Sequence, residues 1–215
     1  SPYHKRQDTF ADRVVRGEIR CSNGLPIAYT SVGDDGTETR IYPQDRMFAH
    51  VGGYASHGKT GIELLGNYQL LSSHAYFLER FVNEVQEQKN IGDNVITTLD
   101  YELQKTAYEA LGDYRGTVIA LEPSTGKVLA MVSKPDYNPN EIETNWKNIS
   151  GGSSSVLLNR ATQGLYPPGS TFKILTLLQY MREGNDLENW TYESDGSYEA
   201  DGVTINRYHG KRHGT

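Results

Sequence analysis

Three Ser-x-x-Lys pairs are the residues of this chain whose types and spacing suit nucleophilic catalysis. They are Ser56/Lys59, Ser124/Lys127 and Ser170/Lys173. A serine hydroxyl becomes a nucleophile when a base within about 3 Å accepts its proton, and a neutral lysine amine can be that base. Two fixed residues recur by chance in a chain of 215 residues, so the segment around each pair must decide which one could do chemistry.

The first two pairs lie in segments typical of turns and loops. Ser124 belongs to the turn sequence Pro123-Ser124-Thr125-Gly126 between two apolar runs, and Lys127 opens the second run. Ser56 lies in the glycine-rich stretch 52–61. Serine and glycine are ordinary turn residues, so we interpret Ser56 and Ser124 as structural.

The third pair stands at the start of an apolar helix predicted from Thr171 to Arg182. Prolines and a glycine at 167–169 precede Ser170, and the run 172–178 is too apolar for an exposed helix. At the N-terminus of a buried helix, unpaired N–H groups favour negative charge beside the serine, and a low-dielectric setting favours a neutral amine on Lys173. The alternative is that Ser170 only caps the helix and Lys173 reaches out of an apolar face.

The elements that must position these residues differ along the chain. Residues 1–62 predict short strands and tight turns, with Gly33-Asp34-Asp35-Gly36 as one turn, and no long helix. An amphipathic helical stripe follows over 63–89, with an interruption near Ser72-Ser73, and Val95–Leu99 is strand-like. Asp100 then starts a helix that stops at Gly112.

The second half begins with the clearest hairpin of the sequence. Apolar runs at 116–122 and 127–133 flank the turn that contains Ser124. Residues 134–158 have loop composition, and the tail 186–215 is polar and rich in Tyr and Gly. We expect a domain boundary near residue 92, giving domains 1–92 and 93–215.

Composition excludes several classes of function. The 21 basic and 27 acidic residues give a formal charge of −6, which argues against a nucleic-acid surface. The single Cys21 forms no internal disulfide, and no run of about 18 apolar residues is present. His209 and His213 have a spacing found in zinc sites, but the only cysteine is far away, so we expect a solvated loop, no metal and no cofactor.

Several motifs, in preserved order, resemble those of class B penicillin-binding proteins, the D,D-transpeptidases of the bacterial cell wall. The string from Asn159-Arg160-Ala161 to Tyr166-Pro167-Pro168-Gly169-Ser170-Thr171-Phe172-Lys173-Ile174 resembles their active-site box. Upstream resemblances are Arg16-Gly17-Glu18-Ile19, Asn23-Gly24, Ile27-Ala28, Tyr42-Pro43, Gly52-Gly53-Tyr54, Gly61-Ile62-Glu63, Thr97-Thr98-Leu99-Asp100, Leu103-Gln104 and the 116–133 hairpin. The likeness therefore extends from about Arg13 to about Tyr180.

This resemblance implies an enzyme on the extracytoplasmic face of the cell membrane, held by an N-terminal anchor helix that the given sequence does not contain. Residues 1–92 would form a small irregular pedestal domain of the dimerisation or docking type. Residues 93–215 would form the N-terminal portion of a transpeptidase domain, a β-lactamase-like antiparallel sheet with packed helices. The resemblance therefore implies an α+β fold. A membrane-embedded glycosyltransferase is the implied partner.

The resemblance also implies roles for the third pair. Ser170 would attack the D-Ala-D-Ala carbonyl of a peptidoglycan stem peptide, with Lys173 as proton acceptor. The backbone N–H of Ser170 would be one half of the oxyanion hole. Penicillin and other β-lactams would acylate the same serine.

Two boxes of the family pattern do not follow the nucleophile in this sequence. Neither Ser-x-Asn nor Lys-Thr/Ser-Gly occurs after Lys173. Lys59-Thr60-Gly61 precedes the nucleophile and lies in the pedestal region, so we reject it as the third box. We therefore expect the chain to be the N-terminal part of a longer protein and to be inactive alone.

Other functions compete with the transpeptidase hypothesis. Residues 53–60 satisfy the P-loop pattern Gly-x4-Gly-Lys-Thr, although 48–51 is a poor parallel strand and no strand ending in Asp follows. A class D β-lactamase or β-lactam-sensor domain also carries a Ser-Thr-Phe-Lys box, but the pedestal motifs disfavour both. A non-catalytic docking module for a wall polymerase is the remaining alternative.

Overall fold

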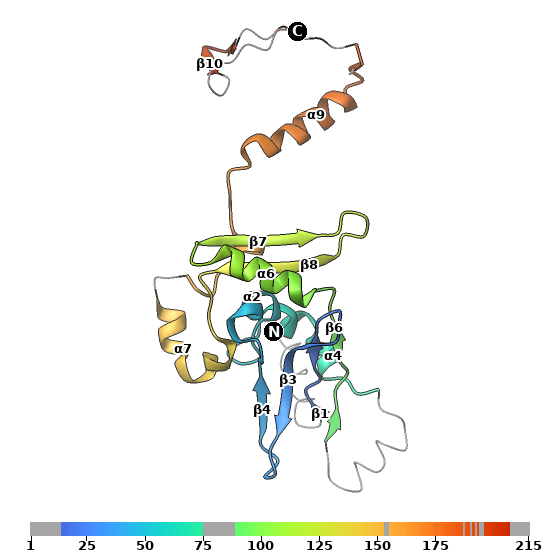
Figure 1. The fold of residues 1–215 in the computed structure, drawn as a ribbon, viewed down its shortest axis with the longest axis vertical. Coiled ribbons are helices and arrows are strands. Elements are labelled where there is room, and N and C mark those ends of the chain that lie inside the picture. The colour runs from blue at the N-terminus through green and yellow to red at the C-terminus, as the bar shows by residue number, and fades with distance from the viewer. Residues whose placement is uncertain are drawn as a thin grey trace. The chain divides into compact units, whose positions relative to one another are not determined.

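The chain forms two units, one ending at Leu165 and one beginning at Tyr166. The computed structural model describes residues 14–74, 89–152, 155–186, 188–189, 191, 193 and 196–206. The chain contains helices together with mostly antiparallel strand pairs, which confirms the α+β prediction (Figure 1). None of the described helices has the length and apolar character that a membrane crossing requires.

Short strands build the first part of the first unit, as predicted. β4 (Glu38–Ile41), β3 (Pro26–Val32), β2 (Ile19–Arg20) and β6 (Val95–Ile96) lie side by side in that order, with β6 parallel to β2. β1 (Val14–Val15) pairs in parallel with β5 (Asn90–Ile91). The β3–β4 turn is closed by a hydrogen bond of 2.9 Å from Gly36 N–H to the Gly33 carbonyl, and Gly36 has a φ of +79° that a glycine adopts without strain.

Four short helices follow β4 in the chain. They are η1 (Asp45–Phe48), α2 (Ala49–Gly52), α3 (Gly61–Leu65) and α4 (Asn67–Leu70). The stripe predicted over 63–89 is thus divided at Gly66 and ends before Ser72-Ser73; its continuation with Phe77, Leu78, Phe81 and Val85 lies outside the described residues. The core between sheet and helices contains Ile19, Cys21, Ile27, Ala28, Tyr42, Phe48, Val51, Leu70 and Leu99.

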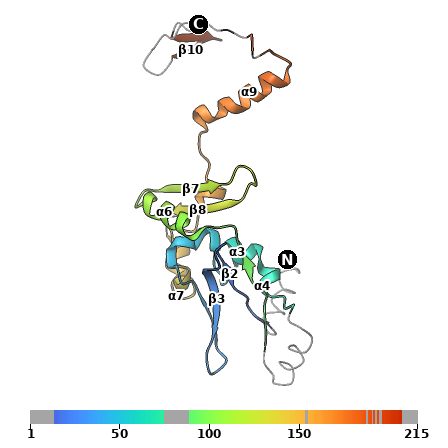
Figure 2. The ribbon, with the colours of Figure 1, turned by 45° about the vertical axis from the view of Figure 1, so that its right-hand side comes forward.

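Helix α6 (Tyr101–Leu111) lies against the hairpin of β7 (Gly116–Leu121) and β8 (Val128–Lys134), as Figures 1 and 2 show. Both elements were predicted from local signals, and both are confirmed. Asp100 caps the helix, because its side chain accepts a hydrogen bond of 2.8 Å from Leu103 N–H. Ala107 of the helix packs with Ala130 and Val132 of β8.

The prediction of loop over 134–158 is wrong for much of the segment. It contains η2 (Pro139–Glu141) and α7 (Ile142–Gly151). Ile142 is fully buried against Tyr54 and Tyr137, and Trp146 packs on the same cluster. Tertiary packing of these side chains stabilises a helix that the polar local composition did not predict.

The second unit contains η3 (Gly169–Phe172), α9 (Lys173–Arg182) and a hairpin of β9 (Ser197–Ala200) and β10 (Val203–Asn206). The helix predicted over 171–182 is confirmed. It is followed by Gly184 at a φ of +80°, a common way to end a helix.

Candidate active site

Ser170 and Lys173 lie on one helical run at the start of the second unit. Ser170 is the second residue of η3, and Lys173 is the first residue of α9. Gly169 has a φ of +54°, and Thr171 N–H donates to the Pro168 carbonyl over 3.2 Å. The Pro-Pro-Gly sequence therefore sets the turn that starts the helix, as predicted, and the i, i+3 spacing places both side chains on a similar side of the run.

The prediction that this helix is buried is wrong in the structure. None of the ten residues of α9, all of them described, is buried, and Ser170 and Lys173 are exposed. Apolar side chains of the helix remain open to solvent, at 64% for Ile174 and 56% for Leu175. The physical reason is that the covering surface such a helix needs is not supplied by the described residues of its own unit. The backbone N–H of Lys173 donates to the Ser170 carbonyl, but among the described residues no side-chain hydrogen bond joins the Ser170 hydroxyl to the Lys173 amine.

Ser124 lies in the β7–β8 turn, as predicted. The turn is closed by Gly126 N–H, which donates to the Glu122 carbonyl over 2.8 Å, and Gly126 has a φ of +74°. Ser124 and Lys127 are both exposed. The surroundings of this pair are those of an ordinary hairpin turn.

The Ser56/Lys59 pair lies in the loop between α2 and α3. Lys59 N–H donates to the Ser56 carbonyl over 3.4 Å, and Lys59 has a φ of +57°. The residues before this loop form the helix α2 and not a strand. A P-loop requires a strand that leads into its phosphate-binding turn, so the structure does not have the P-loop arrangement here.

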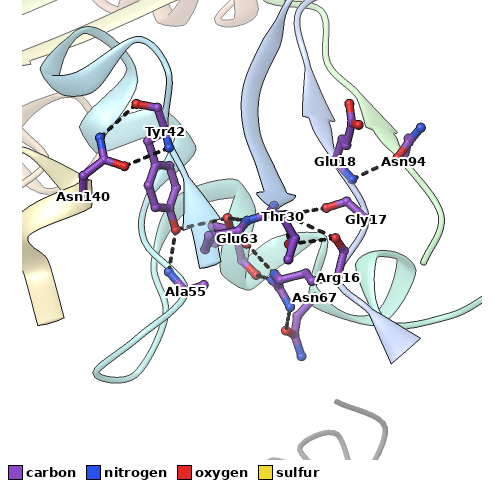
Figure 3. Close-up of polar contacts among 11 residues, drawn as sticks. Arg16, Gly17, Glu18, Thr30, Tyr42, Ala55, Glu63, Asn67, Asn94 and Asn140 are labelled. Carbon is purple, nitrogen blue, oxygen red and sulfur yellow. Dashed lines mark hydrogen bonds and ion pairs between the residues drawn. The ribbon is translucent and has the colours of Figure 1, made fainter. Parts of the chain in front are cut away.

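A buried ionic network in the first unit was missed by the sequence reasoning (Figure 3). The side chain of Glu63, in α3, is completely buried. Its carboxylate accepts hydrogen bonds from Arg16 Nε at 2.7 Å, from Arg40 Nε at 2.8 Å and from the Tyr42 hydroxyl at 3.2 Å. Arg16 also donates to Asn67 Oδ1 at 2.7 Å. Such a buried charge is tolerated because two guanidinium groups and a hydroxyl compensate it.

Two members of the network, Arg16 and Tyr42, have shifted pKa values. Burial lowers the pKa of Arg16, and the neighbouring Glu63 carboxylate partly offsets that effect. Burial, followed by the Glu63 charge, raises the pKa of Tyr42 well above its usual value. Both pKa shifts are those expected of buried groups in a structural ion cluster. Arg16 and Glu63 stood in motifs that the resemblance marked, but nothing in their local sequence indicated that they meet.

Tyr42 also joins the sheet region to the segment before α7. Its backbone N–H donates to Asn140 Oδ1 at 2.9 Å, and Asn140 Nδ2 donates to the Tyr42 carbonyl at 3.0 Å. In a second joint, the fully buried Gln104 donates to Met47 O and Met131 O and accepts from Met131 N–H. The side-chain amides of Asn140 and Gln104 thus satisfy backbone groups from distant parts of the first unit and hold these parts together.

Two protein families match the chain in sequence. Residues 16–95 match the family described as "Penicillin binding protein A dimerisation domain", and residues 116–215 match "Penicillin binding protein transpeptidase domain". The first match includes the Glu63 network. The second includes the β7–β8 hairpin, Ser170 and Lys173.

Individual relatives agree with these matches. The Peptidoglycan D,D-transpeptidase PbpA of Mycolicibacterium smegmatis is 38% identical over 187 residues, which are 79% of this chain and 38% of the relative. MrdA of Acinetobacter baumannii, also a peptidoglycan D,D-transpeptidase by name, is 33% identical over 74% of this chain and 28% of its own length. The solved penicillin G acyl-enzyme complex of penicillin-binding protein A from M. tuberculosis aligns with a TM-score of 0.77 at 31% identity, over 93% of this chain and 50% of that one. The chain thus spans half or less of these relatives. The chain belongs to the class B penicillin-binding proteins, as its motifs predicted, and it carries their dimerisation domain followed by sequence of their transpeptidase domain.

Proposed function

We propose that the protein acts as a peptidoglycan D,D-transpeptidase with Ser170 as nucleophile and Lys173 as its base. The observation that carries this proposal is the placement of both residues on one helical run, directly after a Pro-Pro-Gly turn, inside the stretch that matches the transpeptidase family. Two relatives that are named peptidoglycan D,D-transpeptidases also support the proposal.

The proposed reaction has two steps. Ser170 Oγ attacks the carbonyl carbon of the penultimate D-Ala of a stem peptide while Lys173 Nζ accepts the hydroxyl proton. The backbone N–H of Ser170 is one of the donors that stabilise the oxyanion. The terminal D-Ala leaves with a proton, and an acyl-serine ester remains. An amine of a neighbouring stem then attacks this ester, forms the cross-link and releases Ser170. β-Lactams would acylate the same hydroxyl.

The remaining parts of the proposal concern organisation. We assign residues 1–92 to a pedestal domain and residues 93–215 to the N-terminal portion of the transpeptidase domain. The site of action would be the extracytoplasmic face of the cell membrane, with an N-terminal anchor and a membrane-embedded glycosyltransferase as partner. Within the first unit, the hydrogen bonds between Tyr42 and Asn140 join the proposed pedestal to η2, which belongs to the proposed transpeptidase portion.

The proposal is tested by labelling the full-length protein with a fluorescent penicillin. Ser170→Ala should reduce the acylation rate at least about 10³-fold, because the attacking oxygen is gone. Ser124→Ala is the matched control and should be labelled at the wild-type rate. Loss of labelling in both variants, with folding intact by circular dichroism, would break the assignment.

The same assay applied to the 215-residue chain makes a separate prediction. Because neither Ser-x-Asn nor Lys-Thr/Ser-Gly follows Lys173, we expect no stoichiometric labelling of this chain. Rapid labelling of one equivalent would mean that the residues present are sufficient for acylation.

A further inference from the structure

Helix α8 (Arg160–Gln163) is the last helix of the first unit before the chain reaches Ser170. Two residues after this helix, the side chain of Leu165 is 99% exposed, and residues 166–169 are exposed as well. The connection from Gln163 to Ser170 includes two prolines, whose fixed φ restricts its conformations. The proposed reaction gives no task to the residues that hold α8 in place.

Asn159 ties the start of α8 to two other elements of the first unit. Its side-chain Oδ1 accepts a hydrogen bond of 3.0 Å from Ala161 N–H, which caps the helix. Its Nδ2 donates to the His50 carbonyl of α2 over 3.3 Å, and the same atom lies 3.8 Å from the Met131 sulfur in β8. One side chain therefore both starts α8 and attaches it to α2 and β8.

A second tie comes from Ser133 of β8, a side chain that is buried. Its hydroxyl accepts a hydrogen bond of 2.9 Å from Arg160 N–H and donates to the Leu158 carbonyl over 3.2 Å. These two partners are backbone groups on either side of Asn159. The buried guanidinium of Arg160 also donates to the Ser155 and Leu158 carbonyls over 3.3 Å. The backbone at 158–160 is thus fixed, because breaking these buried hydrogen bonds would leave polar groups unpaired.

Given Ser170 as the nucleophile of the proposed function, we propose that Asn159 and Ser133 are positioning residues for it. By anchoring α8 they fix the end from which the proline-containing connection carries Ser170, and this restricts where the Ser170 hydroxyl can lie. Acyl transfer depends steeply on such placement, since a shift of about 1 Å in a reacting group can cost about 10²-fold in rate. Neither residue takes part in the chemical steps.

The test measures acylation of the full-length protein over a range of penicillin concentrations, which separates the acylation rate constant from the half-saturating concentration. Ser133→Ala should lower the rate constant about tenfold and leave the half-saturating concentration within about twofold, because attack depends on the placed hydroxyl. Thr117→Val is the matched control. Thr117 pairs with Ser133 across the hairpin, and its hydroxyl donates to the Val132 carbonyl at 2.6 Å; this variant should acylate at the wild-type rate.

Two outcomes of this experiment would overturn the proposal and leave the proposed function standing. One is an unchanged rate constant in Ser133→Ala. The other is an equal loss in Ser133→Ala and Thr117→Val, which would reflect a general loosening of the β7–β8 hairpin.

Asn159→Ser separates the formation of α8 from its attachment. Serine caps a helix about as well as asparagine, but its side chain is too short to reach both Ala161 N–H and the His50 carbonyl. The acylation rate constant should fall about tenfold, as in Ser133→Ala, with the circular dichroism spectrum unchanged. A wild-type rate constant in this folded variant would overturn the role of Asn159.

A double-variant cycle tests whether the anchor acts through the connection. Pro167→Gly makes the connection more flexible and should itself lower the rate constant. Ser133→Ala should then have less than about a twofold further effect, because a flexible connection no longer transmits the position of α8. The full effect of Ser133→Ala in both backgrounds would overturn the proposal. Labelling of Ser170→Ala at the wild-type rate would instead refute the proposed function, and the positioning roles with it.

Discussion

The first unit buries a charged side chain, whereas the second unit leaves apolar side chains exposed to solvent. In the first unit the carboxylate of Glu63 is 0% exposed, whereas in the second unit the side chain of Leu175 is 56% exposed. Residue type alone would predict the reverse. Glu63 is buried because Arg16 and Arg40 neutralise it, and Leu175 is exposed because no described element of its unit covers it.

Helices α6 and α9 show the same contrast between the units. α6 is polar over most of its surface, yet it buries Gln104 and Ala107 against β8 and its neighbours. α9 is the more apolar helix and buries nothing. Periodicity therefore predicts that a helix forms, whereas the surfaces that pack on it decide whether it is buried.

The largest expected effect is at Glu63. Glu63→Gln should lower the free energy of unfolding of the chain by about 3–5 kcal/mol, because it leaves two arginines buried without their counter-charge. Urea unfolding followed by circular dichroism measures this. Glu18→Gln is the control: Glu18 pairs with Arg20 at 2.6 Å on the surface, and its loss should cost less than about 1 kcal/mol. Equal costs in the two variants would show that the Glu63 network does not hold the first unit together.

A pair of leucine variants sharpens the contrast between the units. Leu70→Ala removes a side chain that is 0% exposed and should cost about 2–5 kcal/mol in the same experiment. Leu175→Ala should change the stability of the chain by less than about 0.5 kcal/mol, because its side chain is already in contact with water. A large loss in Leu175→Ala would mean that α9 has a packing partner in the 215-residue chain.

The pH dependence of stability should also come from a buried residue of the first unit, His50. Burial lowers the pKa of His50, whose ring lies 3.2 Å from the Pro135 carbonyl. Below the unfolded-state value of about 6.5, the unfolded chain binds the proton that the folded chain resists. Stability should therefore fall as the pH decreases through this value, by up to about 1.4 kcal/mol per unit.

The control for this prediction is His50→Gln, which keeps a donor but cannot titrate. It should flatten the slope of unfolding free energy between pH 7 and pH 5. An unchanged slope in this variant would assign the pH dependence to other groups.

The smallest effect concerns the start of α6. Asp100→Ala removes the hydrogen bond to Leu103 N–H and should cost about 1 kcal/mol. Asp113→Ala, at an exposed residue just after the helix, should cost almost nothing by comparison. If both variants unfold at the same urea concentration, the cap contributes no stability.

The features that the sequence predicted well are those with local causes. The cap at Asp100, the turn at Gly126 and the helix after Gly169 each depend on residues within four positions of one another. The Pro-Pro-Gly turn in particular predicted that a helical run starts near Ser170 and includes Lys173. This is the part of the candidate site that could be predicted.

The features that escaped prediction depend on contacts between distant residues. Glu63 meets Arg16 and Arg40 across separations of 47 and 23 residues, so no local pattern indicates the network. α7 forms in a polar segment because Ile142 and Trp146 find the aromatic cluster around Tyr54. The apolar run of α9 indicated a covering surface, but a sequence pattern cannot say which residues provide it.

The most direct test of the proposed function is to locate the penicillin adduct in the full-length protein by mass spectrometry. The protein is treated with penicillin G, digested under conditions that keep the ester, and the modified peptide is sequenced. We predict one penicilloyl group per molecule, carried by Ser170. An adduct on another serine, Ser124 and Ser56 included, would contradict the assignment of Ser170 as the nucleophile.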